Sequence, residues 1–321
     1  MKYTVAIRTL GKAGDKYQKL LNSLAIQTIP ASAINVYIAE GYDLPKETIG
    51  IEKYIYVKKG MVAQRALSYD DINTEYVLFL DDDVYLPPNG VESLYSALVE
   101  NQADVISPDV FPNAERSLLG RLLMGVSGRI FARKDDGVWA YKVMRNAGYS
   151  YNNLPSKDIY LSQSNAGPCF FCKKSDMLSV HFEEEQWMDK MPYAMGEDQV
   201  MYYKMYLSGL KVLTIFNSGI VHLDAASTLE TLDRVKTRIY CDFRFKTIFW
   251  HRFIYLPENK WLLRQWSKLC IGYAFGFGLL ISLIKGQIDI FKIKKKAIED
   301  GIGFIKSCDY KKLPKIKKIT K

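Results

Sequence analysis

The sequence predicts an α/β fold with a mostly parallel central sheet and a C-terminal helical extension. Short apolar, β-branched segments alternate with segments of helical periodicity, which is the pattern of strands and crossover helices in a parallel sheet. Residues 75–80 are almost entirely apolar, as expected of a strand that is buried on both faces. With 48% hydrophobic and 13% aromatic residues, the 321-residue chain can bury a sizeable core and is not broadly disordered.

The expected elements alternate along the first two thirds of the chain. Strands are predicted at residues 3–8, 34–39, 53–57, 75–80, 103–107, 168–172, 211–216 and 219–222. Helices are predicted at residues 15–27, 61–69, 88–100 and 197–208, the third with proline in its first turn. Since ligands bind at the carboxyl ends of strands in such sheets, we expect the functional site there.

Two regions differ from this regular pattern. Residues 112–164 mix Arg, Asp, Gly, Tyr and Asn without a clear period, which predicts a mobile insertion over an edge of the site. The C-terminal part is predicted to be helical and basic. We therefore divide the chain into an α/β domain, residues 1–230, and a helical, membrane-associating extension, residues 231–321.

The net charge of +9 lies almost wholly at the C-terminus. Residues 285–321 contain twelve lysines and four acidic residues, a net charge of +8, so the rest of the chain is nearly neutral. An enzyme acting on nucleic acid would carry its positive charge across the site itself. The distribution argues against a nucleic-acid partner and favours an acidic surface near the C-terminus.

The cysteines and the N-terminus indicate a cytoplasmic protein. Five cysteines, an odd number without framework spacing, favour a reducing compartment. Cys169 and Cys172 form a C-x-x-C pair within a predicted strand, which we interpret as buried structural thiols. The apolar residues 3–7 are followed by Arg8, too early for a secretory signal.

Three consecutive carboxylates, Asp81, Asp82 and Asp83, follow the apolar strand at residues 75–80. Adjacent carboxylates repel one another and are most easily tolerated around a divalent cation. A solvated acidic turn is the alternative. We expect a hard cation at this end of the strand.

Two more polar groups are placed to reach the same edge. Glu197 and Asp198 open a predicted helix, where carboxylates serve either as partners of the helix dipole or as a base that accepts a proton from a hydroxyl nucleophile. His222 ends a predicted strand. It is either a structural histidine or a neutral imidazole that completes a carboxylate site for Mn²⁺ or Mg²⁺.

In order and spacing, these motifs resemble those of family 2 inverting glycosyltransferases, which have the nucleotide-sugar fold called GT-A. Residues 5–11 look like that family's first strand and turn, and residues 23–28 like its first helix end. Residues 60–65 are similar to its Gly-x-x-x-Ala-Arg-Asn segment. Residues 79–83 match its Asp-x-Asp motif, and residues 196–199 match its Glu-Asp motif.

The resemblance covers residues 3–225, with some departures. Gln64 and Ala66 differ from the family pattern, and Glu40 stands where the family usually has an Asp that contacts the nucleotide base. More weakly, residues 234–306 look like the helical tail of rhamnosyltransferase-like members.

The resemblance implies a role for each candidate residue. Asp198 would deprotonate the acceptor hydroxyl, and Glu197 would orient Asp198 or the acceptor. A divalent metal, Mn²⁺ or Mg²⁺, would be held by Asp81, Asp83 and His222. The nucleotide pocket would be lined by Arg8, Thr9, Glu40, Arg65, Asp81 and Asp82. An exposed helical arginine is an equally good interpretation of Arg65.

Residues 269–284 form a run of sixteen residues without charge between Lys268 and Lys285. A membrane-spanning helix needs about 20 apolar residues, and three glycines weaken this run as an isolated helix. We expect a helix that lies in or against the membrane interface, with the following lysines near anionic lipid. A buried helical hairpin with a solvated basic end is the alternative.

The leading hypothesis is a metal-dependent, inverting glycosyltransferase that acts at the inner face of the membrane. It would move a sugar from a nucleotide-diphosphate sugar to a hydroxyl of a lipid-linked glycan in cell-surface polysaccharide biosynthesis. Two alternatives stay open: a non-catalytic nucleotide-sugar-binding protein, and a metal-dependent nucleotidyltransferase or phosphodiesterase. Neither the donor sugar and its nucleotide base nor the acceptor and linkage follow from the sequence.

Overall fold

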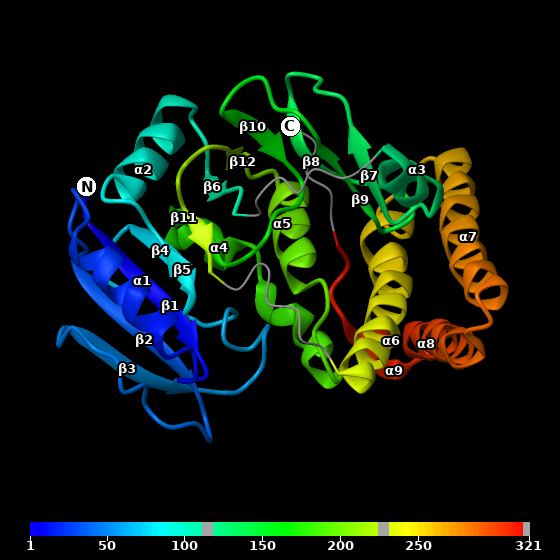
Figure 1. Ribbon diagram of the computed structural model, residues 1–321, viewed down its shortest axis with the longest axis horizontal. Helices are drawn as coiled ribbons and strands as arrows, with labels where there is room; N and C mark the ends of the chain where they lie inside the picture. Colours follow the sequence, from blue (N-terminus) through cyan, green and yellow to red (C-terminus); the bar gives the residue numbers. More distant parts are fainter. Residues whose placement is uncertain (111–117, 224–230, 317–321) are drawn as a thin grey trace.

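A computed structural model describes residues 1–110, 118–223 and 231–316 of the chain (Figure 1). Its strands are β1 (Tyr3–Thr9), β2 (Ala33–Ala39), β3 (Glu52–Val57), β4 (Tyr76–Asp81), β5 (Val84–Tyr85), β6 (Val105–Pro108), β7 (Ile130–Arg133), β8 (Trp139–Val143), β9 (Tyr149–Asn152), β10 (Ile159–Ser162), β11 (Cys169–Lys173), β12 (Val212–Ile215) and β13 (Val221–His222). All the predicted strands are present, with their ends shifted by at most two residues.

The described strands form one large sheet and one small sheet. The large sheet has eleven strands in the order β3-β2-β1-β4-β11-β6-β12-β10-β8-β9-β7, and β13 pairs with β5 in the small one. Strands β3, β2, β1 and β4 are parallel neighbours, while β11 runs antiparallel to both β4 and β6. The predicted α/β class with a mostly parallel sheet and C-terminal helices is confirmed.

Both faces of the sheet are covered, which explains the continuous apolar runs in its strands. In β4, Leu78 and Leu80 pack with α1 (Asp15–Ala25) and α2 (Gly90–Glu100) on one face. Val77 and Phe79 face the other side, where they pack in a core with α4 (Lys174–Ser179), the 3₁₀ helix η1 (Phe182–Lys190) and α5 (Glu197–Leu207). Successive side chains of a strand point to opposite faces, so both sets must be apolar.

The predicted helix at residues 61–69 is wrong, because this segment forms turns. The carboxylate of Asp189 accepts hydrogen bonds from the backbone N–H groups of Val62 and Ala63, at 3.0 and 2.9 Å. The hydroxyl of Tyr69 donates to the carbonyl of Arg65, at 2.8 Å, which a longer helix would use for its own ladder. Tyr69 itself is in the left-handed region, with a φ of 52°.

The predicted irregular insertion is also wrong for residues 118–164. These residues form α3 (Leu118–Val126) and strands β7 to β10, which extend the large sheet. The strands are short, and in β9 the buried positions are polar, Ser150 and Asn152. In strands this short, and in β9 above all, hydrophobic periodicity is too weak to predict them. The earlier part of the predicted insertion, residues 112–117, lies outside the described residues.

The C-terminal part is helical, as predicted. It consists of α6 (Leu232–Phe249), the π-helix η2 (Trp250–Tyr255), α7 (Trp261–Ile284), α8 (Ile288–Lys306) and α9 (Cys308–Lys312). Phe245 and Phe249 of α6 lie in the same core as α5. The guanidinium of Arg252 in η2 binds the fully buried Glu185 of η1, whose carboxylate is also ion-paired with Lys204 of α5 at 3.1 Å. These contacts hold α5 between the sheet and the C-terminal helices.

Gly196, immediately before α5, is expected to tolerate no side chain. It has a φ of 82°, and a Cβ there would lie 2.3 Å from the ring of Phe245. Backbone strain and overpacking together should make Gly196→Ala lower the free energy of unfolding by about 2–4 kcal/mol in urea titrations. Gly50→Ala is the control, because Gly50 has a φ of 83° with nothing within 4 Å of a Cβ. Equal losses in the two variants would contradict the role of the Phe245 contact.

Candidate functional site

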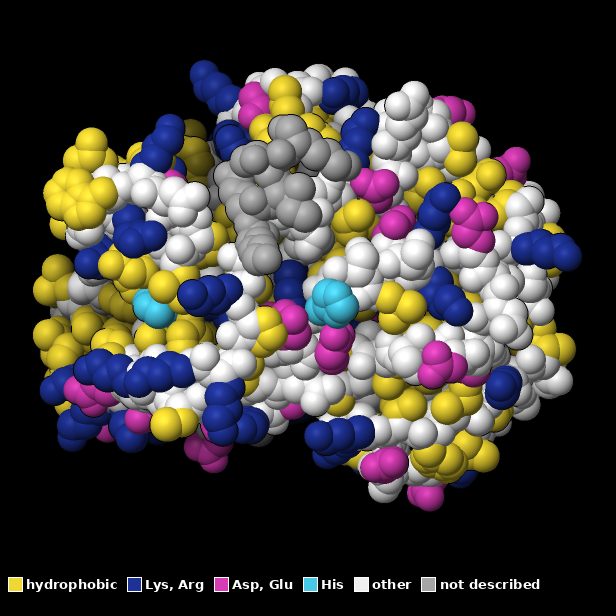
Figure 2. Space-filling view, turned by 180° about the vertical axis from the view of Figure 1, so that it is seen from behind, with side chains coloured by type: hydrophobic (Ala, Val, Ile, Leu, Met, Phe, Trp, Pro, Cys, Tyr) yellow, Lys and Arg dark blue, Asp and Glu magenta, His cyan; other side chains and the backbone are white. Residues whose placement is uncertain are grey.

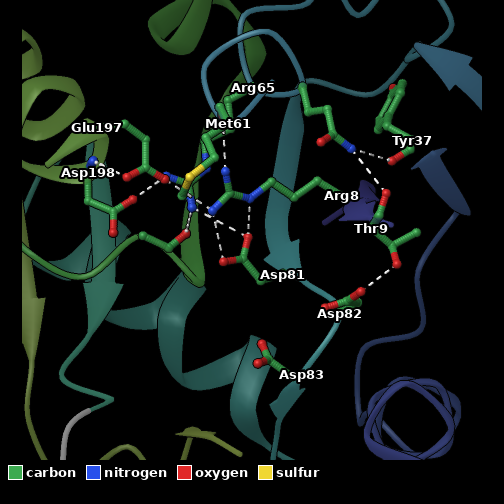
Figure 3. Close-up of polar contacts among 12 residues, drawn as sticks. Arg8, Thr9, Tyr37, Met61, Arg65, Asp81, Asp82, Asp83, Glu197 and Asp198 are labelled. Carbon is green, nitrogen blue, oxygen red and sulfur yellow. Dashed lines mark hydrogen bonds and ion pairs between the residues drawn. The ribbon is translucent and has the colours of Figure 1, made fainter. Parts of the chain in front are cut away.

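Most of the predicted site residues gather where β1 and β4 end and α5 begins (Figure 3). The register of these parallel strands places Arg8 beside Asp81. Glu197 and Asp198 occupy the first turn of α5, where the partial positive charge of the helix N-terminus favours carboxylates. The fold thus brings together residues that are far apart in the chain.

Arg8 and Asp81 form a two-pronged ion pair. Both carboxylate oxygens of Asp81 are bound, one by Nε of Arg8 and the other by Nη2 at 2.9 Å. Nη1 of Arg8 donates to the carbonyl of Met61 at 3.1 Å, and Nη2 reaches Oε1 of Glu197 at 3.3 Å. Burial opposes the charge on Asp81, but Arg8 and Arg65 outweigh it and hold the pKa of Asp81 below its usual value. Asp81 is therefore an anion at neutral pH.

Arg65 is a buried cation between three carboxylates. Its side chain is 5% exposed, so the equally weighted interpretation as an exposed helical arginine is wrong. Nη1 is ion-paired with Asp198 and donates to Oε1 of Glu197 at 3.1 Å, and Nη2 contacts Oδ1 of Asp81 at 3.4 Å. Nη2 also donates to the carbonyl of Gly167 at 2.6 Å. Arg65 thereby holds the N-terminal turn of α5 against the carboxyl edge of the sheet.

The two acidic residues of α5 differ in exposure. The side chain of Asp198 is 31% exposed, whereas that of Glu197 is 5% exposed. Burial, together with repulsion from Asp198, raises the pKa of Glu197 to about 7, although Arg65 and Arg8 oppose this rise. Of these two carboxylates, Asp198 is the one that can meet a molecule from solvent.

Asp82 turns away from this network towards the end of β1. Its carboxylate accepts a hydrogen bond from the hydroxyl of Thr9, which in turn accepts one from the backbone N–H of Gly11 at 2.8 Å. Burial and the neighbouring charges of Asp83 and Asp81 raise the pKa of Asp82 to about 6. The hydrogen bond from Thr9 works in the opposite direction. Thr9 and Asp82, both expected to line the nucleotide pocket, thus lie in contact at the carboxyl edge of the sheet.

Asp83 lies apart from Arg8 and Arg65 (Figure 3). Its carboxylate meets His222 instead. The two-stranded sheet causes this contact, because β13 pairs His222 with Val84, next to Asp83. Nε2 of His222 is 3.0 Å from Oδ2 of Asp83. A histidine 139 residues away in the sequence is thus brought to the acidic cluster, through a small antiparallel sheet and not through the end of a strand in the large sheet.

The residues around Asp83 fit a divalent cation only in part. In the described part of the chain, no three His, Cys, Asp or Glu side chains lie together as a metal site. The carboxylate of Asp81 is held by Arg8 and Arg65, away from the Asp83–His222 pair. Oδ1 of Asp83, however, is buried and meets no hydrogen-bonding partner among the described residues. An oxygen and an imidazole nitrogen of this kind fit two ligands of Mn²⁺ or Mg²⁺.

Glu40 and Gln64 lie at the carboxyl ends of β1 and β2. Glu40 is exposed and directly follows β2, on the same side of the sheet as Thr9. The buried amide of Gln64 donates to the carbonyls of Thr9 and Tyr37, at 3.1 and 3.4 Å, and so joins the ends of β1 and β2. The sequence marked Gln64 only as a departure from the pattern of the family that it resembles. It did not predict that Gln64 links the ends of two strands.

The buried-thiol interpretation of Cys169 and Cys172 is confirmed. Both lie fully buried in β11, beside β4. Burial raises the pKa of both thiols, so neither is a ready nucleophile or metal ligand.

Comparisons with known proteins concern the fold. No protein-family model matches the sequence, and no curated protein matches it either. Among solved structures, GalNAc-T7 with UDP, GalNAc and Mn²⁺ is similar with a TM-score of 0.48 and 12% identity, over 86% of this chain and 55% of that one. TarS from S. aureus is similar with a TM-score of 0.45 and 14% identity, over 92% of this chain and 55% of that one. The chain therefore spans about half the length of both proteins.

Proposed function

We propose that the chain is a metal-dependent, inverting glycosyltransferase of the GT-A, family 2 type. It transfers a sugar from a nucleotide-diphosphate sugar to a hydroxyl of a lipid-linked glycan in cell-surface polysaccharide biosynthesis. The observation that carries the proposal is that Arg65 joins Asp81 and Asp198 at the carboxyl edge of the sheet, while Asp83, two residues after β4, meets His222. We expect the chain to work on the cytoplasmic face of a membrane, in line with its basic C-terminus.

The donor nucleotide is expected to bind across the ends of β1, β2 and β4. Thr9 and Glu40 lie at the ends of the first two strands, where a nucleoside would reach both. Arg8 and Arg65 are both ion-paired with Asp81, and they offset its negative charge beside a bound diphosphate. Because both arginines are already held by carboxylates, their positions are fixed before the donor binds.

Asp198 is the proposed base. One of its oxygens is held by Arg65 while the side chain is 31% exposed, so the other oxygen can accept the proton of an acceptor hydroxyl. That hydroxyl attacks the anomeric carbon from the face opposite the diphosphate, so a single displacement inverts the anomeric configuration. Glu197, buried against both arginines, positions Asp198 and does not touch the acceptor.

Asp83 and His222 would hold the metal, and Asp81 would join them only on leaving Arg8. A bound Mn²⁺ or Mg²⁺ would neutralise charge that builds on the departing nucleoside diphosphate. Asp82, paired with Thr9, would remain at the nucleotide.

A thermal-shift screen of nucleoside diphosphates and nucleotide sugars tests the proposal. A ligand that binds only the folded protein stabilises it by about 2.7 kcal/mol at a hundred times its Kd, so we expect one nucleoside diphosphate with Mn²⁺ to raise the Tm by several degrees. Asp83→Asn should lose the Mn²⁺-dependent part of this shift, and Asp233→Asn, an exposed carboxylate of α6, should keep it.

Two results would contradict the proposal. A shift that is the same with and without Mn²⁺ would exclude the metal role of Asp83. No shift with any nucleoside diphosphate would exclude a nucleotide-sugar donor.

A further inference from the structure

The helix α3 exposes nearly all of its apolar side chains. None of its residues is buried, although leucine and other apolar residues make up most of the helix. Its exposed apolar side chains are Leu118 (70%), Leu119 (66%), Leu122 (58%), Leu123 (58%) and Val126 (47%). Side chains at this spacing lie on one face of a helix, so α3 presents a row of leucines to its surroundings.

The helix α7 presents a second row. Its exposed apolar side chains on this face are Leu262, Trp266, Leu269, Tyr273, Leu280 and Leu283. They follow one another at intervals of three, four and seven residues, so they form a stripe along one face from Leu262 to Leu283, about 33 Å of this 24-residue helix. The helix is long and apolar enough to cross a membrane, and only 22% of its most apolar stretch is buried.

The opposite face of α7 is packed against protein. Ser267, Ile271, Ala274 and Ser282 are buried there. Phe275 packs on Phe243 of α6, with ring centroids 5.6 Å apart. Lys294 of α8 donates to the carbonyl of Gly278 and the hydroxyl of Ser282, at 2.7 and 2.8 Å. A helix packed in this way against α6 and the basic helix α8 does not stand alone across a bilayer, but it can lie along one.

The two rows belong to one surface. The hydroxyl of Tyr273 in α7 donates to the carbonyl of Val126 at the end of α3, at 2.8 Å. A Cβ on Gly128, just after α3, would lie 3.4 Å from Ala274 of α7. Figure 1 shows α3 beside the upper part of α7, at the edge of the molecule. We call this the α3–α7 surface and define it as the eleven exposed side chains named above for the two helices.

The two helices of this surface carry only positive charges, and the neighbouring helix α8 is basic overall although it contains Asp289, Glu299 and Asp300. Within α3 and α7 the charged residues are Arg121, Arg264 and Lys268, and neither helix contains an acidic residue. Exposed lysines continue at Lys285 and along α8. In Figure 2, seen from behind, hydrophobic side chains gather along the left edge, and Lys and Arg side chains lie beneath them with some Asp and Glu side chains among them. Apolar rows with a basic border complement a bilayer with anionic headgroups.

We propose that the α3–α7 surface seats the protein on one leaflet of an anionic membrane, with both helices lying in the interface. The inference adds α3 to the peripheral membrane contact already expected of residues 269–284. It stands on exposure and packing, independently of the proposed sugar transfer. A glycan acceptor attached to lipid would then be held on the same membrane as the enzyme.

Sedimentation of the full-length chain with lipid vesicles tests this. Vesicles of phosphatidylcholine alone are compared with vesicles of equal parts phosphatidylcholine and phosphatidylglycerol. The variants are Leu119→Ser with Leu123→Ser in α3, and Leu262→Ser with Leu269→Ser in α7. The matched control is Ile26→Ser with Ile51→Ser, which removes two side chains that are 57% and 67% exposed beside α1 and β3.

We expect the wild type to bind the anionic vesicles more tightly, and an alkaline carbonate wash to release it. Each helix variant should bind at least about tenfold more weakly, since each removes several buried methylene groups from the contact, while the control binds as the wild type does. Circular dichroism should show unchanged folding, because the replaced side chains are exposed.

Several outcomes would overturn the proposal. Binding that survives the α3 changes would remove α3 from the contact, and binding that survives carbonate would indicate a spanning helix. A wild-type dimer that fails to bind vesicles and becomes a monomer in either variant would identify a second copy as the partner. The thermal shift with a nucleoside diphosphate is measured on the same variants. If that shift persists while vesicle binding fails, the membrane proposal is wrong and the proposed sugar transfer is unaffected.

Discussion

Asp198→Asn is expected to lower the rate of sugar transfer by about 10²–10⁴-fold, the usual contribution of a general base. Asparagine keeps an oxygen that can accept from Arg65 but does not take up the hydroxyl proton. Nucleoside-diphosphate binding should be nearly intact, because Asp198 lies in α5 and not among the strand ends proposed to hold the nucleotide. Transfer assays and calorimetric titration with the nucleoside diphosphate measure the two properties separately.

Glu197→Gln is the matched comparison for this prediction. Glu197 shares Arg65 with Asp198 but is 5% exposed, so its loss should disturb positioning and reduce transfer less than Asp198→Asn does. Transfer by Asp198→Asn at the wild-type rate would refute the assignment of the base. A larger loss in Glu197→Gln would move the proton transfer to the buried carboxyl.

The sequence predicted the parts of this protein that depend on local pattern. Strands such as β1 and β4 are recognisable because their residues are apolar and β-branched, and Asp81 is recognisable because it follows such a strand directly. His222 was expected near the acidic cluster because it ends a predicted strand, but its contact with Asp83 comes from the antiparallel pairing of β13 with β5 in a separate sheet. These predictions needed no knowledge of individual side-chain contacts.

Other features depend on contacts that no local pattern encodes. The turns at residues 61–69 follow from Asp189, far away in the chain, which takes the first backbone donors of the segment. The helix α3 lies in a region without a regular period, and its leucines gain meaning only beside α7. The ion pairing of Asp81 with two arginines likewise depends on the placement of Arg65, which the sequence left undecided.

Arg65→Met is expected to be the most destabilising single change at the site. It leaves Asp81, Glu197 and Asp198 without their shared cation, and breaking a buried ion pair from one side costs about 3–5 kcal/mol. Urea titrations measure the loss in the free energy of unfolding. Arg145→Met is the control, because Arg145 is 37% exposed in its pair with Glu258 and should cost about 1 kcal/mol or less.

The loss caused by Arg65→Met should also increase with pH. The pKa of Glu197 is already about 7 in the folded protein, above its ordinary value of 4.5, and Arg65 works to lower it. A carboxyl with a raised pKa favours folding at low pH, and that contribution disappears as the pH rises through the folded-state pKa. Without Arg65 the pKa of Glu197 rises further, so ionising it costs more. We therefore expect Arg65→Met to lose less free energy of unfolding at pH 5.5 than at pH 8. A loss that shrinks with rising pH would show that Arg65 is not the shared cation of these carboxylates. A loss equal to that of Arg145→Met would show the same.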